Sequence, residues 1–541
     1  MGHRASVDAL AARPWEVLVI GGGIVGAGIA RDAAMRGLSV ALVERGDLAA
    51  GTSAISSRLI HGGLRYLEHG EVRLVFEALH ERGVLLRIAP HLVHPLAFTF
   101  PVYRGDRVPR WKLLAGLWLY DLLAGTRNVG RHRGLGKRAL LRAEPMLRER
   151  GLTGGARYWD CQADDARLTL ATARSAARHG AAVASYTEVT ALLHADGRVA
   201  GAELRDRLTG ATGALRARVV VNATGPWTDA LRRLEDPGAR PLLRLTKGTH
   251  VVVPRARLGN RGAITLTSAV DGRVMFVLPW GEHAYIGTTD TDHDGPPEAA
   301  RVDEADVTYL LRSANAAFPS AHLTPEDVTA AWTGVRPLVA DPHAATTAQV
   351  SREHVLLTGP GRMLTIAGGK LTTYRRMAAQ VVDEVTRELH RLDGRPRAAR
   401  APTDREPLPG GEARDLTPIA AAAEELGLSA ATAAHLVARY GAEVPALLNL
   451  VAADRELATP LHPAHPAIAA QVVYAVRREW AQTVADVLVR RLRLREETDD
   501  RGVAAAPAVA RRMGELLGWD AAQVARAAED YAREEAAVFT A

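Results

Sequence analysis

The stretch VIGGGIVGAGIARDAAMRGLSVALVE, residues 19–44, reads as a buried strand, a glycine turn, a helix and a second strand. Gly21, Gly23 and Gly26 satisfy G-x-G-x-x-G, which needs glycine for a tight turn, close approach of backbone to a pyrophosphate, and close helix–strand packing. The second strand ends at Glu44, about 20 residues beyond the first glycine, where an acid can accept hydrogen bonds from ribose hydroxyls. The stretch therefore predicts a Rossmann-like site for a dinucleotide.

The residues after Glu44 favour FAD over NAD. An NAD-binding domain continues with further strand–helix units, whereas residues 45–63, RGDLAAGTSAISSRLIHGG, form a loop that can wrap along an extended cofactor. ARVVVNATGPW (217–227) and MLTIAGGKLTTY (363–374) each read as a strand that ends in a glycine turn. The helix start in the second can stabilise negative charge on a reduced flavin. The predicted FAD contacts are Gly21, Gly22, Gly23, Ile24, Gly26, Glu44, Arg45, Thr52, Ser53, Ser57, His61, Gly62, Ala223, Gly225, Gly369, Lys370, Leu371 and Thr372.

The composition of the 541 residues, 47% hydrophobic and 24% charged, predicts a globular protein of two or three domains. The single cysteine, Cys161, excludes an intramolecular disulfide and a thiolate metal cluster, and it indicates a reducing compartment. The start of the chain lacks a secretory apolar run, and no stretch approaches eighteen uninterrupted apolar residues. We therefore expect a soluble or peripheral protein.

The formal charge of +7 could reflect binding to nucleic acid, to an anionic membrane surface or to an acidic substrate. Basic residues are spread along the chain, and no helix-turn-helix, zinc-finger or RNA-platform motif occurs, so we expect no nucleic-acid partner. DTDHDG, residues 290–295, begins like a calcium loop, but the twelfth position holds Arg301 instead of glutamate. No metal site is predicted.

Eight segments together resemble the FAD-dependent, quinone-linked glycerol-3-phosphate dehydrogenases, from about residue 15 to the end of the chain. SSRLIHGGLRYLE (56–68) and GGKLTTYR (368–375) are specific to that family, whereas the glycine fingerprint and the ATG turn occur throughout the D-amino-acid-oxidase-like flavoproteins. The other segments, in chain order, are DDARL (164–168), VVNATGPW (220–227), KGTHVVVPR (247–255), IGTTD (286–290) and GVRPL (334–338).

The resemblance implies hydride transfer from C2 of sn-glycerol 3-phosphate to flavin N5, which gives dihydroxyacetone phosphate, followed by electron transfer to a quinone. A phosphate dianion needs charge-assisted donors, and arginine offers a planar fork. Through these motifs, the resemblance assigns substrate binding to Arg65, Tyr66, His250, Arg336 and Lys370.

The C2 hydroxyl must lose its proton as the hydride leaves, and histidine is the natural acceptor. His61 and His250 are both candidates for this catalytic base, and the sequence does not separate them. Arg336 would polarise the developing oxyanion or hold the phosphate. Without their motifs, each of these residues would more often be structural.

Two alternatives remain open at this stage. One is a glycerol-3-phosphate oxidase that reduces oxygen, because its substrate residues would be much the same. The other is a basic protein that binds polyanions or lipid and retains only a vestigial flavin fold.

The fold class is α/β, with a Rossmann-like FAD-binding domain, a mostly antiparallel substrate-binding sheet and a C-terminal helical domain. A linker rich in Pro, Gly and charge, residues 396–415, precedes the helical part. The resemblance implies that this part is accessory and serves stability or association, with a homodimer as one partner arrangement. The predicted ranges are 15–85, 150–240 and 350–395 for the FAD-binding domain, 86–149 and 241–349 for the substrate-binding domain, and 404–541 for the cap.

Residues 107–138, RVPRWKLLAGLWLYDLLAGTRNVGRHRGLGKR, place an apolar, aromatic centre between basic flanks. The segment suits docking on an anionic membrane surface, where a quinone could reach the flavin. A core helix with solvated arginines fits it equally well. Docking would place the protein in the cytoplasm, peripherally on the inner face of the cytoplasmic membrane.

Overall fold

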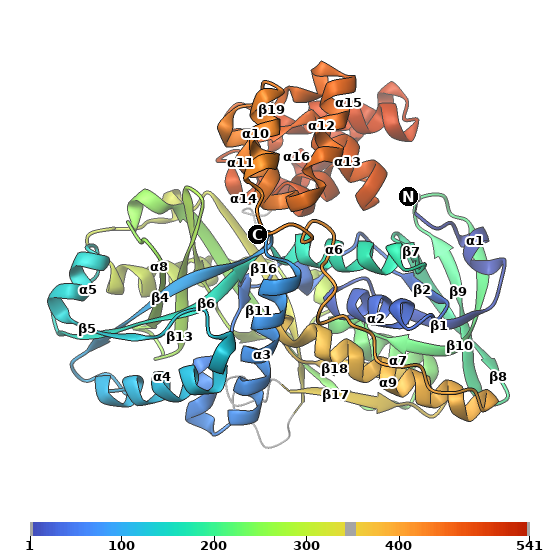
Figure 1. Cartoon of the computed structure of the whole chain (residues 1–541), viewed down its shortest axis with the longest axis horizontal. Helices are drawn as coiled ribbons and strands as arrows, with labels where there is room; N and C mark the ends of the chain where they lie inside the picture. The colour runs from blue at the N-terminus through green and yellow to red at the C-terminus, as the bar shows by residue number, and fades with distance from the viewer. Residues whose placement is uncertain (1–3, 341–352, 538–541) are drawn as a thin grey trace.

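The computed structural model describes residues 4–340 and 353–537 as two large sheets that lie side by side beneath a helical cap (Figure 1). The predicted α/β class is confirmed. The predicted domain boundary at residues 349 and 350 lies outside the described residues.

The first sheet has the strand order β17-β18-β10-β1-β2-β7. Its neighbouring strands run parallel, except that β17 is antiparallel to β18. β2 is buried along its whole length, as expected of a parallel strand covered on both faces. The strands are β1 (Trp15–Ile20), β2 (Val40–Val43), β7 (Ala182–Ala184), β10 (Thr212–Asn222), β17 (His354–Thr358) and β18 (Leu364–Gly368), and β8 (Thr187–Ala195) and β9 (Arg198–Asp206) extend β10 as an antiparallel meander.

Helices cover both faces of this sheet. On one face, apolar side chains of α2, α6 and α9 pack together with β1 and β10. Asp164 caps α6, because its side chain accepts a hydrogen bond from the Arg167 N–H at 3.0 Å. The helices of this part are α1 (Val7–Ala11), α2 (Ile24–Met35), α6 (Asp165–Arg178), α7 (Thr228–Glu235) and α9 (Tyr374–Asp393).

The second sheet has the order β15-β11-β14-β13-β12-β4-β6-β3, with β16 beside β11 and β5 beside β6. Its pairs are antiparallel except β12 with β4, which confirms the mostly antiparallel prediction. The strands are β3 (Leu59–Ile60), β4 (Val93–Tyr103), β5 (Arg133–Gly136), β6 (Leu152–Ala163), β11 (Leu243–Pro254), β12 (Ala263–Thr267), β13 (Val274–Trp280), β14 (His283–Gly287), β15 (Thr291–Asp292) and β16 (Ala330–Val339).

One predicted range needs correction at β6. The range 150–240 assigns it to the FAD-binding domain, whereas β6 pairs with β4 from Val93–Ala163 to Tyr103–Leu152 in the second sheet. That long ladder satisfies the backbone groups of both strands, so β6 belongs structurally with the substrate-binding sheet.

α8 packs on one face of the second sheet, and α3 and α4 pack on the other. Leu113, Leu117 and Tyr120 form the buried stripe of α4. One side of α4 therefore packs in the core, as the core-helix interpretation of residues 107–138 predicts. The helices are α3 (Val72–Ile88), α4 (Arg110–Ala124), α5 (Lys137–Ala143) and α8 (Glu304–Ala317).

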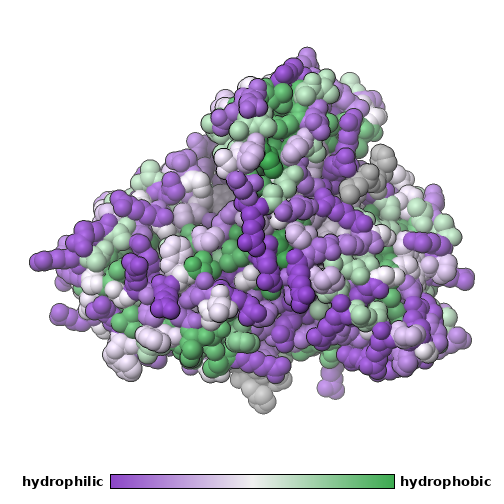
Figure 2. All heavy atoms as spheres, in the orientation of Figure 1, coloured by the Kyte–Doolittle hydropathy of each residue, from purple (hydrophilic) through white to green (hydrophobic). Residues whose placement is uncertain are grey.

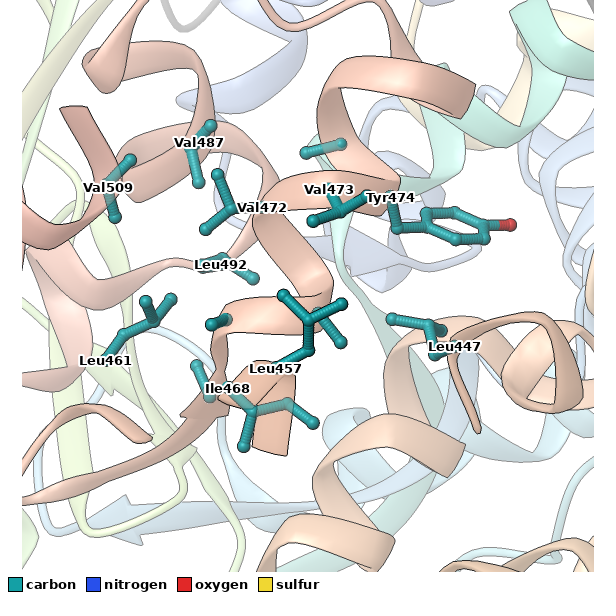
Figure 3. Packing of buried hydrophobic residues seen from close by; sticks show 14 of the residues in the cluster. Leu447, Leu457, Leu461, Ile468, Val472, Val473, Tyr474, Val487, Leu492 and Val509 are labelled. Atoms are coloured by element: carbon teal, nitrogen blue, oxygen red, sulfur yellow. The ribbon is translucent and has the colours of Figure 1, made fainter. Parts of the chain in front are cut away.

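The cap has a hydrophobic core of its own, in which Leu447, Leu457, Ile468 and Val472 pack together (Figure 3). Residues 430–453 are long and apolar enough to cross a membrane by composition, but Gly441 divides them into two helices that contribute side chains to this core. The elements are α10 (Thr417–Glu425), α11 (Ala430–Tyr440), α12 (Val444–Ala453), β19 (Pro460–His462), β20 (His465–Ile468), α13 (Ala469–Glu479), a π-helical turn (Asp486–Arg491), α14 (Leu494–Glu497), α15 (Ala506–Leu517) and α16 (Ala521–Ala537).

Candidate active site

The carboxyl ends of β1, β2, β10 and β18 meet at one edge of the parallel sheet. Gly21 follows β1 with φ +113°, and a Cβ there would lie 2.5 Å from the Ala223 carbonyl oxygen. A Cβ on Gly26 would lie 1.9 Å from the Gly21 oxygen. The close approaches that the fingerprint predicts are therefore present, in the crevice where doubly wound folds bind their ligands.

Glu44 lies at the end of β2, where its carboxylate accepts the N–H of Gly22 at 2.7 Å and of Gly46 at 2.8 Å. Burial raises its pKa, and these two backbone hydrogen bonds oppose the rise. A carboxylate has about four acceptor positions, so Glu44 can also accept from ribose hydroxyls. Ser53 accepts the N–H of Ile24 at 2.9 Å, which ties the following loop to the start of α2.

This edge fits an extended dinucleotide cofactor. Backbone N–H groups at the start of α2 suit a pyrophosphate. At the ends of β10 and β18, Gly225, Gly368 and Gly369 have positive φ, and a 3₁₀ turn, Leu371–Thr373, leads from there into α9. Thr372 links this turn to the loop after β2, because its hydroxyl accepts the His61 N–H at 3.1 Å.

Gly62, a predicted cofactor contact, also packs closely against α4 and β6. Its N–H donates to the Tyr120 hydroxyl at 2.8 Å and lies 3.3 Å from an oxygen of Asp160. A Cβ on Gly62 would lie 2.5 Å from the Tyr120 hydroxyl oxygen. The glycine therefore allows close packing against α4 and β6, and its N–H already has protein partners.

A cavity of about 610 Å³ lies beside the loop and the 3₁₀ turn, within the usual range for small-molecule sites. The structure brings five of the six predicted catalytic and substrate-binding residues to its wall, from three separate stretches of the chain. They are His61, Arg65, Tyr66, Arg336 and Lys370.

The cationic groups converge on this cavity. Lys370 Nζ lies 3.6 Å from the centre of the Tyr66 ring, and Arg65 Cζ lies 5.2 Å from it. Arg336 donates from Nη2 to the Thr288 hydroxyl at 2.8 Å, and Nη1 lies 3.2 Å from a carboxylate oxygen of Asp290. The site is therefore strongly positive and suits an anion.

Glycines in two of the motifs make room for predicted side chains. A Cβ on Gly248, in KGTH, would lie 2.0 Å from Nη2 of Arg336. A Cβ on Gly287, in IGTTD, would lie 2.0 Å from the imidazole of His250. These motifs therefore preserve the space in which Arg336 and His250 lie.

The two histidines occupy different positions. His61 lines the cavity, and burial together with the charges of Lys370, Arg65 and Arg82 lowers its pKa to about 3. His250 is buried on β11, 2.9 Å from the Ser57 hydroxyl and stacked on Trp332 at 5.0 Å. His61 and Ser57 line the cavity, whereas His250 is not among the described residues that do. The geometry favours His61 as the base.

Arg273 is a cavity residue that the sequence analysis did not name. Its Nη1 donates to the Asp290 carbonyl at 2.7 Å and lies 3.6 Å from the carboxylate of Asp290. The antiparallel pairing of the consecutive strands β13 and β14 brings Arg273 to the IGTTD segment. Arg273 lies in none of the family motifs, so no motif pointed to it.

The comparisons with known proteins agree with this geometry. Residues 16–375 match the family described as "FAD dependent oxidoreductase", and residues 401–524 match "C-terminal domain of alpha-glycerophosphate oxidase". Glycerol-3-phosphate dehydrogenase 2 of Mycobacterium tuberculosis is 41% identical over 541 aligned residues, which cover 98% of this chain and 90% of that protein. The human mitochondrial glycerol-3-phosphate dehydrogenase is 38% identical, with 94% of this chain and 71% of that protein covered.

Solved structures extend the likeness to three dimensions. The crystal structure of the glycerol-3-phosphate dehydrogenase from Bacillus halodurans, complexed with FAD, has a TM-score of 0.82 and 31% identity, and 98% of this chain and 96% of that chain are covered. The L-alpha-glycerophosphate oxidase from Mycoplasma pneumoniae, with FAD bound, has a TM-score of 0.55 at 19% identity, with 73% and 98% covered, and shares the fold.

Proposed function

Since the chain belongs to the FAD-dependent glycerol-3-phosphate dehydrogenases, we propose that it passes the electrons of glycerol 3-phosphate to a quinone at a membrane surface. The chain is an FAD-dependent enzyme that oxidises glycerol 3-phosphate. The observation that carries the substrate assignment is the convergence of Arg65, Arg336 and Lys370 on one cavity beside the predicted flavin edge.

The bound FAD supplies a two-electron acceptor for the hydride from C2. Arg336, Arg65 and Lys370 supply charge-assisted hydrogen bonds for the phosphate oxygens, and Arg273 adds a further positive charge to the wall. His61 is neutral near pH 7, so an unprotonated ring nitrogen can take the proton of the C2 hydroxyl. The neighbouring cations disfavour the protonated ring, so they lower the basicity of His61 and favour release of the proton once it has been taken up.

The quinone and membrane part of the proposal rests on an exposed apolar face of α3 and α4. Figure 2 shows apolar side chains along the lower edge of the molecule, where these helices lie in Figure 1. Trp111, Trp118 and Leu122 are each at least 70% exposed, and Phe76 of α3 is 50% exposed. Leu119 is exposed as well and also lines the cavity. The face therefore continues into the cavity, which offers a lipophilic acceptor a short route.

Basic residues next to this face favour an anionic surface. Arg107 and Lys112 are exposed, lie near the start of α4 and line the cavity, and both pair with the single carboxylate of Glu68, at 2.7 and 3.3 Å, which leaves a net positive charge. Exposed apolar patches of this kind mark interaction sites, and adjacent cations add attraction to anionic lipid. We place the enzyme peripherally on the inner face of the cytoplasmic membrane. Association into a homodimer stays a prediction.

We expect a Trp111→Ser, Trp118→Ser double variant to bind vesicles of phosphatidylglycerol and phosphatidylcholine at least tenfold more weakly. Each tryptophan that leaves water contributes roughly 2 kcal/mol of apolar burial. Flotation of the holoenzyme with vesicles measures the loss, and circular dichroism checks the fold. Leu208→Ser, which changes another exposed apolar side chain, serves as the control. Equal binding of the double variant and the wild type would exclude this docking surface.

The acceptor is tested by reducing the enzyme anaerobically with glycerol 3-phosphate and then adding either a soluble quinone analogue or oxygen. We expect bleaching of the flavin absorbance, followed by faster reoxidation with the quinone. Faster reoxidation by oxygen with stoichiometric peroxide would instead identify an oxidase. Flavin that stays oxidised in excess substrate would contradict the substrate assignment itself.

A further inference from the structure

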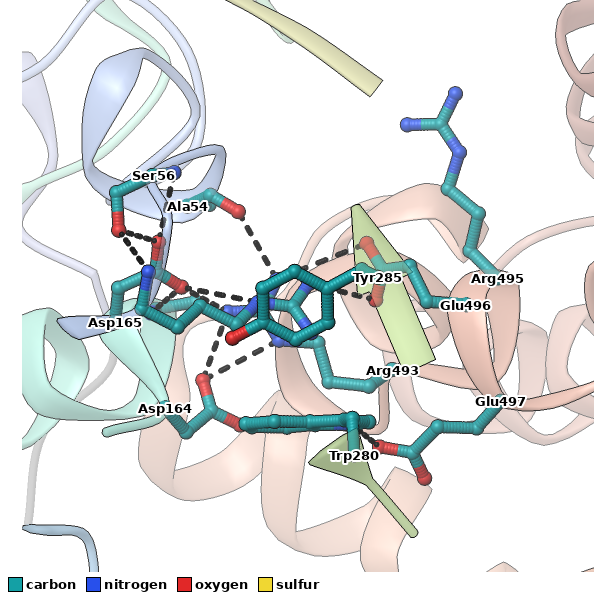
Figure 4. Close-up of polar contacts among 12 residues, drawn as sticks. Ala54, Ser56, Asp164, Asp165, Trp280, Tyr285, Arg493, Arg495, Glu496 and Glu497 are labelled. Atoms are coloured by element: carbon teal, nitrogen blue, oxygen red, sulfur yellow. Dashed lines mark hydrogen bonds and ion pairs between the residues drawn. The ribbon is translucent and has the colours of Figure 1, made fainter. Parts of the chain in front are cut away.

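The cap sends a charged segment, residues 490–497, into the junction with the two sheets (Figure 4). We propose that this segment, here called the clamp, holds the loop of residues 52–58 in the shape that closes the active-site cavity. Arg493 and Glu496 are then positioning residues for the reaction. From the proposed function, the inference takes only that this loop borders the flavin and the substrate.

Arg493 makes the first connection. Its side chain is fully buried, and it donates from Nη1 to the Ala54 carbonyl at 3.0 Å and from Nη2 to Asp164 at 2.8 Å. Nη2 also donates to Asp165. Asp165 in turn accepts the N–H of Ser56 at 3.0 Å and its hydroxyl at 2.7 Å. One cap side chain therefore fixes the loop at two points, and Ser56 lines the cavity.

Glu496 makes the second connection, through Arg58. A carboxylate oxygen of Glu496 lies 3.2 Å from Nη2 of Arg58, which is fully buried. Arg58 Cζ lies 4.6 Å from the ring centres of both Trp280 and Trp332. Trp332 also stacks on His250, which contacts the Ser57 hydroxyl. The clamp thus supports the cavity wall on either side of Ser57.

The ion pairs of the clamp favour a role in positioning the loop over a role in merely holding the cap to the sheets. Burial would raise the pKa of Asp164, but Arg493 and Arg439 outweigh it and lower the pKa to about 2. Buried ion pairs of this kind often add little net stability compared with apolar residues, whereas in some proteins they fix the arrangement of their partners. Because Arg493 and Glu496 contact atoms of residues 52–58, these ion pairs specify the position of that loop.

A matched ion pair crosses the same junction away from the loop. Arg174 of α6 binds Glu443 of the cap through two hydrogen bonds, at 2.5 and 2.7 Å, and is 6% exposed. Within residues 4–340 and 353–537, its hydrogen bonds do not reach residues 52–58. Loss of this pair weakens the junction without touching the loop, so Arg174→Gln is the control for general loosening.

Hydrogen–deuterium exchange of the holoenzyme tests the clamp without substrate. In Arg493→Gln, we expect amide exchange in residues 52–58 to rise at least tenfold, with the Ser56 N–H as the most direct reporter. Glu496→Gln is nearly isosteric and should give a smaller rise in the same residues, so it carries the test if Arg493→Gln does not fold. Arg174→Gln should leave residues 52–58 unchanged and raise exchange in α6.

Two results would overturn the proposal. One is wild-type exchange of residues 52–58 in the folded clamp variants. The other is an equal rise in Arg174→Gln, which would mean that the junction loosens as a whole. Because exchange requires no turnover, a wrong assignment of substrate or acceptor would leave this outcome unaffected.

Discussion

We expect Arg336→Ala to lower kcat/KM for glycerol 3-phosphate by about 10²- to 10³-fold while FAD stays bound. Removing one partner of a hydrogen-bonded charge pair costs about 2–5 kcal/mol, and at about 1.4 kcal/mol per tenfold the expected loss lies inside that interval. Arg336 lies on β16 at the cavity, whereas the predicted FAD edge is formed by the ends of β1, β2, β10 and β18. Steady-state kinetics and the ratio of flavin to protein absorbance measure the two effects.

Gly248→Ala provides a second approach to the same guanidinium, because its Cβ would meet Nη2 of Arg336 at 2.0 Å. We expect it to lower kcat/KM in the same direction. Gly136→Ala is the matched control, since its φ is −73° and no atom lies within 4 Å of the added Cβ. Arg205→Ala, which removes an exposed pair with Glu188, controls for loss of an arginine. Full activity of Arg336→Ala would refute its role.

We expect His61→Gln to lower kcat by about 10²- to 10⁴-fold, the usual contribution of a well-placed base. His250→Gln should lose less, because His250 reaches the cavity wall through Ser57. Single-turnover reduction of the flavin by glycerol 3-phosphate isolates the chemical step. The reverse order, with the larger loss in His250→Gln, would assign the base to His250.

The pH profile follows from the direction of the His61 shift. Burial and nearby cations lower its pKa to about 3, and the active form is neutral, so His61 protonation removes activity only as pH falls through that value. Between pH 5 and 8, the acid limb of kcat/KM should instead follow the second ionisation of the substrate phosphate, about 6 by analogy with phosphate monoesters. The same limb should therefore persist in the residual activity of His61→Gln.

Local patterns predicted the parts of the molecule that depend on neighbours in sequence. The G-x-G-x-x-G turn is a matter of backbone space, and Gly21 and Gly26 show the expected close approaches. The strands read in residues 217–227 and 363–374 are the end of β10 and all of β18, and each is followed by the predicted glycine turn. The gathering of Arg65, Arg336 and Lys370 was predicted through family motifs and is present at one cavity.

The remaining features depend on pairing between distant segments. β6 joined the second sheet because its partner is β4, and its own sequence does not specify that partner. The resemblance implied only stability or association for the cap, and no motif within residues 490–497 points to the loop. The contacts of the cap with the loop exist only in the assembled molecule.

The distance along the chain between Ala54 and Arg493, 439 positions, has a consequence for biosynthesis. Domains form in order of emergence from the ribosome, so the flavin loop is made 439 residues before Arg493. Until then, Asp164 and Asp165 lack this buried cation. We therefore expect the catalytic pocket to reach its final shape only after the clamp has been made.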